Sequence, residues 1–288
     1  METAQLQTFV ALARIGNMTE TAKKRFLTQP AVSSQIAALE MELDALLFNR
    51  SRKGVTLTEA GRVFLLYARD ALMRMESGRS ALASLKGLEQ GSLSIGGGAT
   101  ATTYLLPSKI GAFHARYPNI RFYVREQASR GVVDAVLSGE LDLGIVTLPI
   151  QVPRPDQKKI IIQPWSKDEL KLIVPQNHKL QKRKSFRWQE LDGAQLVLFE
   201  AGSAVREHID QRINDSGIHV DIVMELRSIA SIVQMVRQGI GAAFVSKFAL
   251  GENEGLRCLD GKIGRDLALV YRSDRELSPS ANAFLKMM

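Results

Sequence analysis

The chain has 288 residues, of which 45% are hydrophobic, so it is long enough to form two or three domains with cores of their own. Lysine and arginine number 38 against 30 aspartate and glutamate residues, and the net charge of +8 favours a polyanionic partner. A single cysteine excludes an intramolecular disulfide, and no signal-peptide pattern or apolar run of about 20 residues is present. We therefore expect a cytoplasmic protein with no membrane partner.

Residues 16–36 predict two short helices joined by a tight turn. The first helix is expected to start at Thr19, whose hydroxyl suits an N-cap, and the second to open with Gln29 and Pro30, since proline fits a first helical turn. Apolar residues recur at helical spacing along the second helix. Two short helices in this arrangement are typical of a helix-turn-helix, whose second helix enters the major groove of DNA.

The other face of the second helix distinguishes a DNA-reading helix from a plain helical hairpin in a globular core. Pro30, Ser34 and Ala37 point away from the apolar residues and are small or carry a short polar group. Small side chains that end in a hydrogen-bonding group suit a helix that lies against base edges. The side chains predicted to lie at this DNA contact are Thr28, Gln29, Pro30, Ser33 and Ser34.

The segments on either side complete a small DNA-binding domain. Residues 1–15 form an amphipathic helix that supplies the third side of a core, and residues 47–58 predict two short strands around a turn at Lys53–Gly54. The cations of this ribbon, or wing, suit phosphates or the minor groove: Arg50, Arg52 and Lys53. A second cationic cluster lies at 23–25. One run of charge is usually a solvated surface, whereas two clusters around a helix of small residues form a more specific pattern.

About the first 65 residues resemble the N-terminal domain of LysR-type transcriptional regulators. The resemblance rests on an ordered set of residues: Leu6, Phe9, Ala22, Gln29–Pro30–Ala31–Val32–Ser33, Gln35–Ile36, Leu39–Glu40, Leu47–Phe48–Asn49–Arg50 and Leu57–Thr58–Glu59–Ala60–Gly61. It implies a regulator of transcription and no enzyme, with double-stranded promoter DNA, a small-molecule effector and RNA polymerase as partners. It also implies a homodimer, and a tetramer as in many members of the family.

From Thr58 to about Leu88 the pattern is helical and no proline interrupts it. Such a helix would be about 45 Å long. It carries a narrow apolar stripe, formed by Phe64, Ala68, Ala71, Met75 and Leu82. The sequence shows no partner for this stripe within the chain, so we expect a linker helix that dimerises. Packing of the stripe on the neighbouring domain is the alternative.

Residues 91–288 alternate between short strands and helices, which indicates an α/β domain with a mainly parallel sheet. Strands are expected at 93–96, 120–126, 141–147, 169–174, 195–199, 221–226, 242–245 and 267–271, and helices at 105–117, 132–138, 204–216 and 229–238. The family resemblance implies a bilobal fold of two α/β subdomains, like that of periplasmic binding proteins, with hinge crossings near 161–164 and 264–267.

The expected organisation is therefore a winged helix-turn-helix at 1–58, a dimerising linker helix at 59–90 and an effector-binding domain at 91–288. Lobe I of the last domain comprises 91–161 and 268–288, and lobe II comprises 162–267.

Polar side chains follow the strands whose carboxyl ends would border a cleft between the lobes. Thr100, Thr102 and Thr103 follow the first strand at a helix N-terminus, which suits an anion, and this threonine loop contains no acid. The other predicted effector contacts come from three further strand-to-helix turns: Ser129, Phe199, Gly202, Ser203, Arg206 and Ser228. Helix capping is the alternative for each hydroxyl, and an ion pair with Glu200 or Glu207 is the alternative for Arg206. We expect a small anionic or carboxylate effector and no cofactor.

Two other functions compete with this prediction. Residues 96–101 loosely match a dinucleotide-binding glycine turn and Glu126 ends the next strand, which would suit a nicotinamide-dependent oxidoreductase. No catalytic set accompanies the turn, and the four histidines are scattered without metal-ligand spacing, so we expect no metal site. A solute-binding protein would match the bilobal domain but leaves the first 90 residues without a role.

Overall fold

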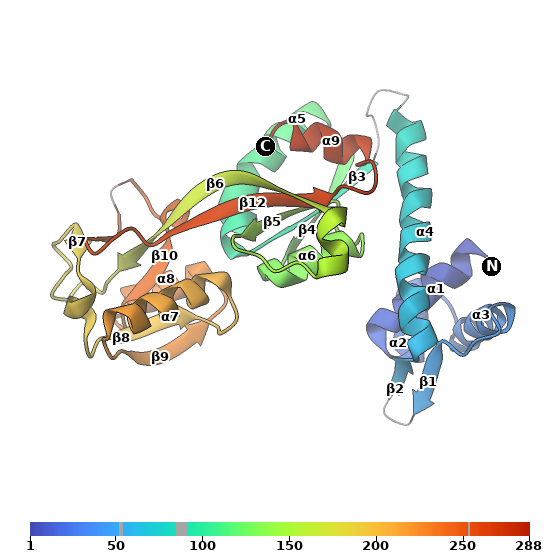
Figure 1. Ribbon diagram of the computed structural model, residues 1–288, viewed down its shortest axis with the longest axis horizontal. Coiled ribbons are helices and arrows are strands. Elements are labelled where there is room, and N and C mark those ends of the chain that lie inside the picture. Colours follow the sequence, from blue (N-terminus) through green and yellow to red (C-terminus); the bar gives the residue numbers. More distant parts are fainter. Residues whose placement is uncertain (52–53, 85–90, 253) are drawn as a thin grey trace. The chain divides into compact units, whose positions relative to one another are not determined.

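The computed structural model describes residues 1–51, 54–84, 91–252 and 254–288, shown in Figure 1. The chain forms two compact units, Met1–Leu82 and Ala83–Met288. Among the helices of these described residues, none is long and apolar enough to cross a membrane. Each unit has a hydrophobic core of its own, as the length of the chain predicts.

The first unit contains a three-helix head with a two-stranded wing and the greater part of a long helix. Its elements are α1 (Thr3–Ile15), α2 (Met18–Arg25), α3 (Gln29–Glu42), β1 (Phe48–Ser51), β2 (Gly54–Leu57) and α4 (Glu59–Ser84). Strands β1 and β2 pair antiparallel. Helices α2 and α3 form the predicted helix-turn-helix, and the ribbon forms the predicted wing, so the winged helix-turn-helix is confirmed.

The sequence predicts the start of α3 correctly and the N-cap of α2 incorrectly. Helix α3 begins as predicted: Thr28 accepts the backbone N–H of Ala31 at 3.3 Å, and proline lies in the first turn. Helix α2 is instead capped by Asn17, whose Oδ1 accepts the backbone N–H of Glu20 at 3.0 Å. The prediction of Thr19 as the N-cap is therefore wrong, because asparagine caps as well as threonine and starts the helix earlier.

The N-terminal half of α4 packs on the head. Phe64 and Ala71 lie against a core that contains Ala68, and the rings of Phe9 and Phe64 are 5.2 Å apart. The expectation that the whole apolar stripe lacks an intrachain partner is thus wrong for this half, which completes the core of the head. Other apolar side chains of α4 remain exposed: Val63, Leu66, Tyr67, Met75 and Leu82.

The second unit is built on a six-stranded sheet with the order β10-β6-β12-β5-β3-β4. Its strands are β3 (Gly91–Gly97), β4 (Ile120–Glu126), β5 (Leu143–Thr147), β6 (Ile160–Ile173), β10 (Ala243–Ser246) and β12 (Gly264–Arg272). Strand β3 pairs in parallel with β4 and β5, as expected. The expectation of a mainly parallel pattern is wrong for this sheet, because β12 pairs antiparallel with both β5 and β6, and β10 pairs antiparallel with β6.

Strands β6 and β12 run side by side from one lobe of this unit to the other (Figure 1). The sequence predicts a strand only from residue 169, whereas β6 is one strand of 14 residues. Its first part belongs to lobe I, and its last residues pair with β10 of lobe II. The bilobal α/β architecture is confirmed, and its two halves share this pair of long strands.

Helices cover the strands of both lobes. Lobe I has the π-helical turn η1 (Ala101–Leu105), which continues as α5 (Leu106–Arg116), together with α6 (Ser129–Leu137), the short helix η2 (Arg154–Lys159) and α9 (Pro279–Leu285). Lobe II has β8 (Gln195–Phe199), α7 (Ala204–Ser216), β9 (Asp221–Leu226) and α8 (Ile229–Arg237), with the short elements β7 (Ser185–Phe186), η3 (Trp188–Leu191), η4 (Lys247–Ala249) and β11 (Arg257–Cys258). Strands β8 and β9 pair in parallel.

The two faces of the lobe I sheet form separate cores. Leu267 and Leu269 of β12 point to the core that contains α5 and α9, whereas Ala268 and Val270 point to the core that contains α6. This alternation follows the two-residue period of a strand. Lobe I is therefore a three-layer structure, with a core on each face of its sheet and the strand ends at the edge that faces lobe II.

Gly144 of β5 provides a test of this packing. A Cβ atom at this position would lie 2.4 Å from Cγ1 of Val132 and 2.8 Å from Cγ2 of Val270. We expect Gly144→Ala to lower the free energy of unfolding by about 1–3 kcal/mol through overpacking, measured by urea denaturation. Gly111→Ala on the exposed side of α5 is the control, because no atom lies within 4 Å of its added methyl group. It should raise stability by about 0.5–1 kcal/mol. Equal effects of the two changes would contradict the packing of α6 on β5.

Candidate functional site

Helix α3 presents a polar face of small residues to solvent. Its apolar residues Val32, Ile36 and Leu39 are fully buried in the head. The exposed residues of the opposite face and its N-terminal tip are Thr28, Gln29, Pro30, Ser34 and Ala37, and Ser33 is half-buried. The structure thus brings the predicted base-contacting residues together on one accessible surface, with Ser33 at its margin.

The wing contributes a cation to the same surface. Nη1 of Arg50 on β1 lies 3.5 Å from Oγ of Ser33, so the guanidinium is held beside the recognition helix. Arg52 and Lys53, the other cations predicted for the wing, lie outside the described residues. Of the three cations predicted for the wing, Arg50 is therefore the one whose position the structure describes.

The second cationic cluster is largely engaged within the head. Lys23 pairs with Glu20 at 2.9 Å, and Nη2 of Arg25 donates to Oε1 of Gln7 at 2.8 Å. Lys24 is exposed. An exposed i,i+3 pair contributes little free energy, so Lys23 can leave Glu20 for a phosphate at small cost.

A cavity of about 530 Å³ lies between the two lobes of the second unit. Its walls are the segments that follow β3, β4, β8 and β9, the last residues of β5 and part of β12. The carboxyl ends of strands are the edge where open α/β sheets bind ligands. Five predicted effector contacts line it: Thr100, Ser129, Phe199, Gly202 and Ser203. Four do not line it: Thr102, Thr103, Arg206 and Ser228.

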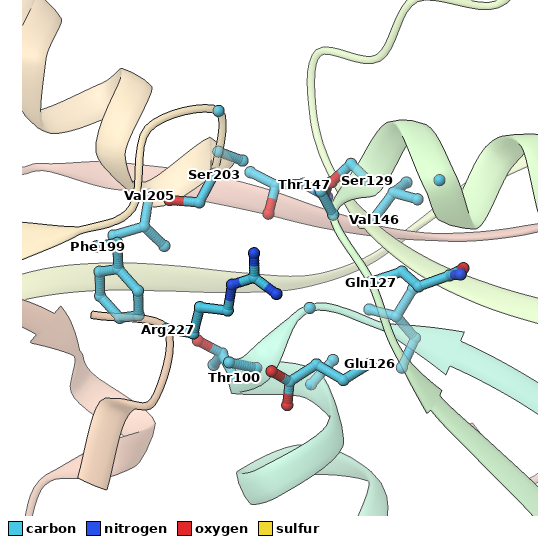
Figure 2. A pocket seen from close by; sticks show the side chains of 18 of the residues that line it. Thr100, Glu126, Gln127, Ser129, Val146, Thr147, Phe199, Ser203, Val205 and Arg227 are labelled. Atoms are coloured by element: carbon cyan, nitrogen blue, oxygen red, sulfur yellow. Dashed lines mark hydrogen bonds between the residues drawn. The ribbon is translucent and has the colours of Figure 1, made fainter. Parts of the chain in front are cut away.

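Figure 2 shows how the polar side chains surround this space. Ser129, Thr147 and Ser203 lie on one side of the view, Thr100 and Glu126 lie on the other, and the guanidinium of Arg227 lies between them. The hydroxyls therefore come from four strand ends in two lobes.

Three helices begin at the cavity. Thr100 precedes η1 and its continuation α5, Ser129 is the first residue of α6, and Ser203 is the N-cap of α7. The first amides of a helix have no partner within the helix, and its N-terminus carries a partial positive charge. Three such ends at one cavity favour a negatively charged ligand.

The hydroxyls of the cavity already act as acceptors. Oγ1 of Thr100 accepts an N–H of Arg265 at 2.6 Å, and Oγ of Ser129 accepts the backbone N–H of Thr147 at 3.0 Å. Oγ of Ser203 caps α7 by accepting a backbone N–H at 3.2 Å. Across the ranges that the structure describes, no acceptor is recorded for the protons of these three hydroxyls. A hydroxyl has one proton to donate, so all three can donate to a ligand in the cavity.

Sequence reasoning missed the acid beside the threonine loop. Strand β4 lies next to β3 with Glu126 opposite Gly97, and Oε2 of Glu126 accepts the hydroxyl proton of Thr102 at 3.0 Å. The loop itself contains no acid, as predicted, but strand pairing brings Glu126 beside it from a position 24 residues away from Thr102. Thr102 uses its hydroxyl within the protein and leaves Thr100 to face the cavity.

Four charged groups line the cavity, and two of them form a pair. Nε of Arg227 donates to Oε2 of Glu200 at 2.5 Å, and Arg227 is otherwise open to solvent. Arg265 is buried beneath the cavity and Glu126 borders it. Thr147 and Arg265 were not predicted, since neither shares a local motif with the threonine loop.

Arg206 has a structural position. Its Nε donates to Asp210 at 2.8 Å, and its Nη1 donates to Glu225 at 2.5 Å and to the carbonyl of Phe199 at 2.9 Å. Among the described residues, Arg206 forms an ion pair with neither Glu200 nor Glu207, the two alternatives predicted from the sequence. Arg206 thus joins α7 to β8 and β9 of lobe II.

His208 lies two residues further along α7, close to the backbone of Leu148 in the first lobe. Burial lowers the pKa of its imidazole, the positive charge of Arg265 lowers it further, and the carbonyl of Leu148 opposes these effects. The imidazole is therefore mainly neutral near pH 7. Within the described residues, no group of three or more His, Cys, Asp or Glu side chains is arranged to hold a metal ion.

Comparisons with known proteins match both units. Residues 3–62 match the family described as bacterial regulatory helix-turn-helix protein, lysR family, and residues 86–288 match the LysR substrate binding domain. A relative from Cyanophora paradoxa, named probable RuBisCO transcriptional regulator, is 34% identical over 97% of this chain and 89% of its own length.

Two solved structures share the fold. Full-length CbnR in complex with its target DNA has a TM-score of 0.70 and 24% identity, covering 100% of this chain and 98% of that chain. The regulatory domain of CcmR from Synechocystis PCC6803 in complex with 2-PG has a TM-score of 0.60 and 23% identity, covering 68% of this chain and 95% of that chain. The oxidoreductase alternative is not supported, because the family models and the relative describe regulators.

The DNA-binding face generates a prediction with two separable effects. Arg50→Ala should weaken binding to every duplex and reduce the slope of log K against log salt by about one unit, because one phosphate contact is lost. Ser34→Ala should instead lower the preference for a selected operator over random duplex by about 1–3 kcal/mol. Fluorescence anisotropy at several salt concentrations measures both quantities.

Arg116→Ala is the matched control for charge, since this exposed arginine lies on α5 and outside the head. It should leave the salt slope within a few tenths of a unit. If Arg50→Ala behaves like this control, Arg50 does not contact phosphate.

Proposed function

The chain belongs to the LysR family and is a DNA-binding transcriptional regulator, and we propose that a small oxyanion held between its two lobes switches its action at promoters. The ligand class is a carboxylate or a phosphate. The observation that carries the proposal is that the free hydroxyl protons of Thr100, Ser129 and Ser203 converge with three helix N-termini on one cavity. Such donors are satisfied best by a ligand with several acceptor oxygens.

The volume and the charge of the cavity support a small ligand. About 530 Å³ falls in the range of ordinary small-molecule sites. Arg227 adds an exposed cation on lobe II, and Ser129 and Thr100 belong to lobe I. A ligand that contacts both lobes favours the arrangement in which those contacts are best, and this differential affinity is what allows it to act as a switch. The 2-PG (2-phosphoglycolate) bound by the CcmR regulatory domain belongs to the same chemical class.

On the DNA side, we propose that α3 enters the major groove and the wing follows the backbone. The predicted residues Arg52 and Lys53 belong to this proposal with Arg50. CbnR, which shares the fold, is seen with its target DNA. We propose RNA polymerase as a further partner, which the protein would contact when it activates transcription. We also propose that the protein acts in the cytoplasm.

A thermal-shift screen of carboxylates, inorganic phosphate and 2-phosphoglycolate tests the effector proposal. A ligand of the folded protein stabilises it by about 2.7 kcal/mol at 100 times its Kd. At least one oxyanion should raise the melting temperature and change the affinity for operator DNA. A screen in which only neutral compounds stabilise the protein would contradict the proposal.

Thr100→Val keeps the shape of the side chain and removes the hydroxyl. We expect the affinity for the oxyanion found in the screen to fall at least tenfold, about 1.4 kcal/mol, measured by calorimetry. Thr102→Val is the comparison, because its hydroxyl donates to Glu126 and does not line the cavity. The sequence-based prediction for Thr102 is tested by the same measurement. A loss of affinity in Thr102→Val alone would place the ligand on the Glu126 side of the threonine loop.

We also propose that the exposed apolar side chains of α4 bind a second copy of the chain, giving a homodimer that can assemble further into a tetramer. These side chains are Val63, Leu66, Tyr67, Met75 and Leu82. Leu66 is 62% exposed and Tyr67 is 69% exposed on a helix whose other face completes the head. Large apolar side chains exposed along one helix are commonly covered by a partner helix. A dimer would present two recognition helices to two half-sites.

Leu66→Glu should convert the dimer to monomer at micromolar concentration, because it would place a charge in the interface. Ala60→Glu is the matched control, since it adds the same charge at an exposed position in the first turn of α4. Sedimentation velocity measures the mass. Dimers of unchanged stability in Leu66→Glu would assign the interface to another surface.

A further inference from the structure

A buried ion pair adjoins the cavity through Arg265, which lines it. Asp168 of β6 and Arg265 of β12 are directly opposite each other in the antiparallel ladder. Oδ2 of Asp168 lies 2.8 Å from Nε and 2.7 Å from Nη2 of Arg265. The side chain of Asp168 is 0% exposed and that of Arg265 is 5% exposed. Both charges are therefore enclosed at the point where the chain passes between the lobes.

The pair is hydrogen-bonded to both lobes. On the side of lobe I, Nη2 of Arg265 donates to Oγ1 of Thr100 at 2.6 Å, and Nη1 lies 3.5 Å from Oγ1 of Thr147. On the side of lobe II, Oδ1 of Asp168 accepts the hydroxyl proton of Ser246 at 2.8 Å. The network thus connects two hydroxyls of the cavity to a carboxylate that is anchored on the other lobe.

The chemistry of the guanidinium determines what the two threonines can do. A threonine hydroxyl in a neutral setting can donate or accept, whereas a guanidinium can only donate. Arg265 occupies a lone pair of Thr100 and approaches that of Thr147, so both protons are directed elsewhere. Both threonines line the cavity. A buried ion pair is a weak source of stability compared with apolar packing, so stability alone does not account for it.

We propose that Arg265 is a positioning residue that makes the cavity selective for oxyanions, by turning the hydroxyl protons of Thr100 and Thr147 away from the guanidinium and toward the ligand. Asp168 and Ser246 hold the guanidinium in place, and the ligand contacts the threonines. This inference rests on the proposed oxyanion effector and names the residue pair that sets its charge selectivity. Neither member of the pair belongs to the DNA-binding head.

The test uses the full-length protein with 2-phosphoglycolate and inorganic phosphate as probes. The double change Asp168→Asn with Arg265→Gln removes both charges and keeps hydrogen-bonding amides of similar shape. Calorimetry should show at least a tenfold loss of affinity for the probe that binds the wild type. Arg265→Lys keeps a donor-only cation opposite Asp168, so its affinity should stay within about threefold of the wild type.

A second pair of variants leaves the ion pair intact, in case the double variant does not fold. Thr147→Val removes one hydroxyl and should weaken probe binding at least fivefold, whereas Thr147→Ser keeps it and should bind within twofold of the wild type. Equal probe affinity in the wild type, the double variant and Thr147→Val would overturn the role of Arg265 and leave the effector proposal standing.

Two other results would also decide the matter. Equal losses in the double variant and Arg265→Lys, with the same fall in melting temperature, would show that the pair only stabilises the fold and overturn the inference. If neither probe nor any other oxyanion of the screen binds the wild type, the proposed function fails, and the inference fails with it.

Discussion

The antiparallel pairing of β6 with β12 is the constraint on which the effector unit depends. Each strand crosses from one lobe to the other, so the register between them determines which residues of the two lobes meet. The register shifts between Leu267 and Ala268, opposite Ser166 and Pro164. Proline has no backbone N–H for the ladder, which explains an irregularity at this position. Beyond it, the ladder places Arg265 opposite Asp168 beneath the cavity.

The cavity combines a neutral surface of donors with charges that are mostly paired. Arg227 is paired with Glu200, and Arg265 is paired with Asp168. In the proposed function, the attraction of the cavity for an anion therefore rests less on unpaired cations than on hydroxyl protons and helix amides that point inward. Fixed dipoles of this kind discriminate by geometry, because each proton must reach an acceptor oxygen at the right place. In this proposal, the same hydroxyls that accept structural hydrogen bonds donate their protons to the ligand.

Helix α4 has one face that completes the core of the head and another that remains exposed. Phe64 and Ala71 close the head around Phe9, and this packing belongs to a single chain. The side chains at 66 and 67 follow on another face of the same helix and remain exposed. A stripe on a helical wheel gives the direction of side chains, but it does not say which neighbour covers them. The same periodic pattern is compatible with an intrachain and an intermolecular partner.

The elements predicted from sequence were those with strong local signals. The bounds expected for β4, β8, α7 and β9 agree with the structure, because alternating apolar residues, caps and turn residues lie within each segment. The helix-turn-helix and the hydroxyls at strand ends follow from the same kind of evidence. Helix caps were predicted less reliably, because Asn17 and Thr19 are both able to cap the N-terminus of a helix.

Only the tertiary structure decided how these elements meet. It placed Glu126 beside Thr102, made β6 a single strand through both lobes and joined Arg265 to Asp168, Thr100 and Thr147. Arg265 is 97 positions from Asp168 and 165 from Thr100 along the chain. The physical reason is that helix and strand periodicity records which face of an element is buried. The register between strands far apart in the chain depends on the packing of the complete sheet.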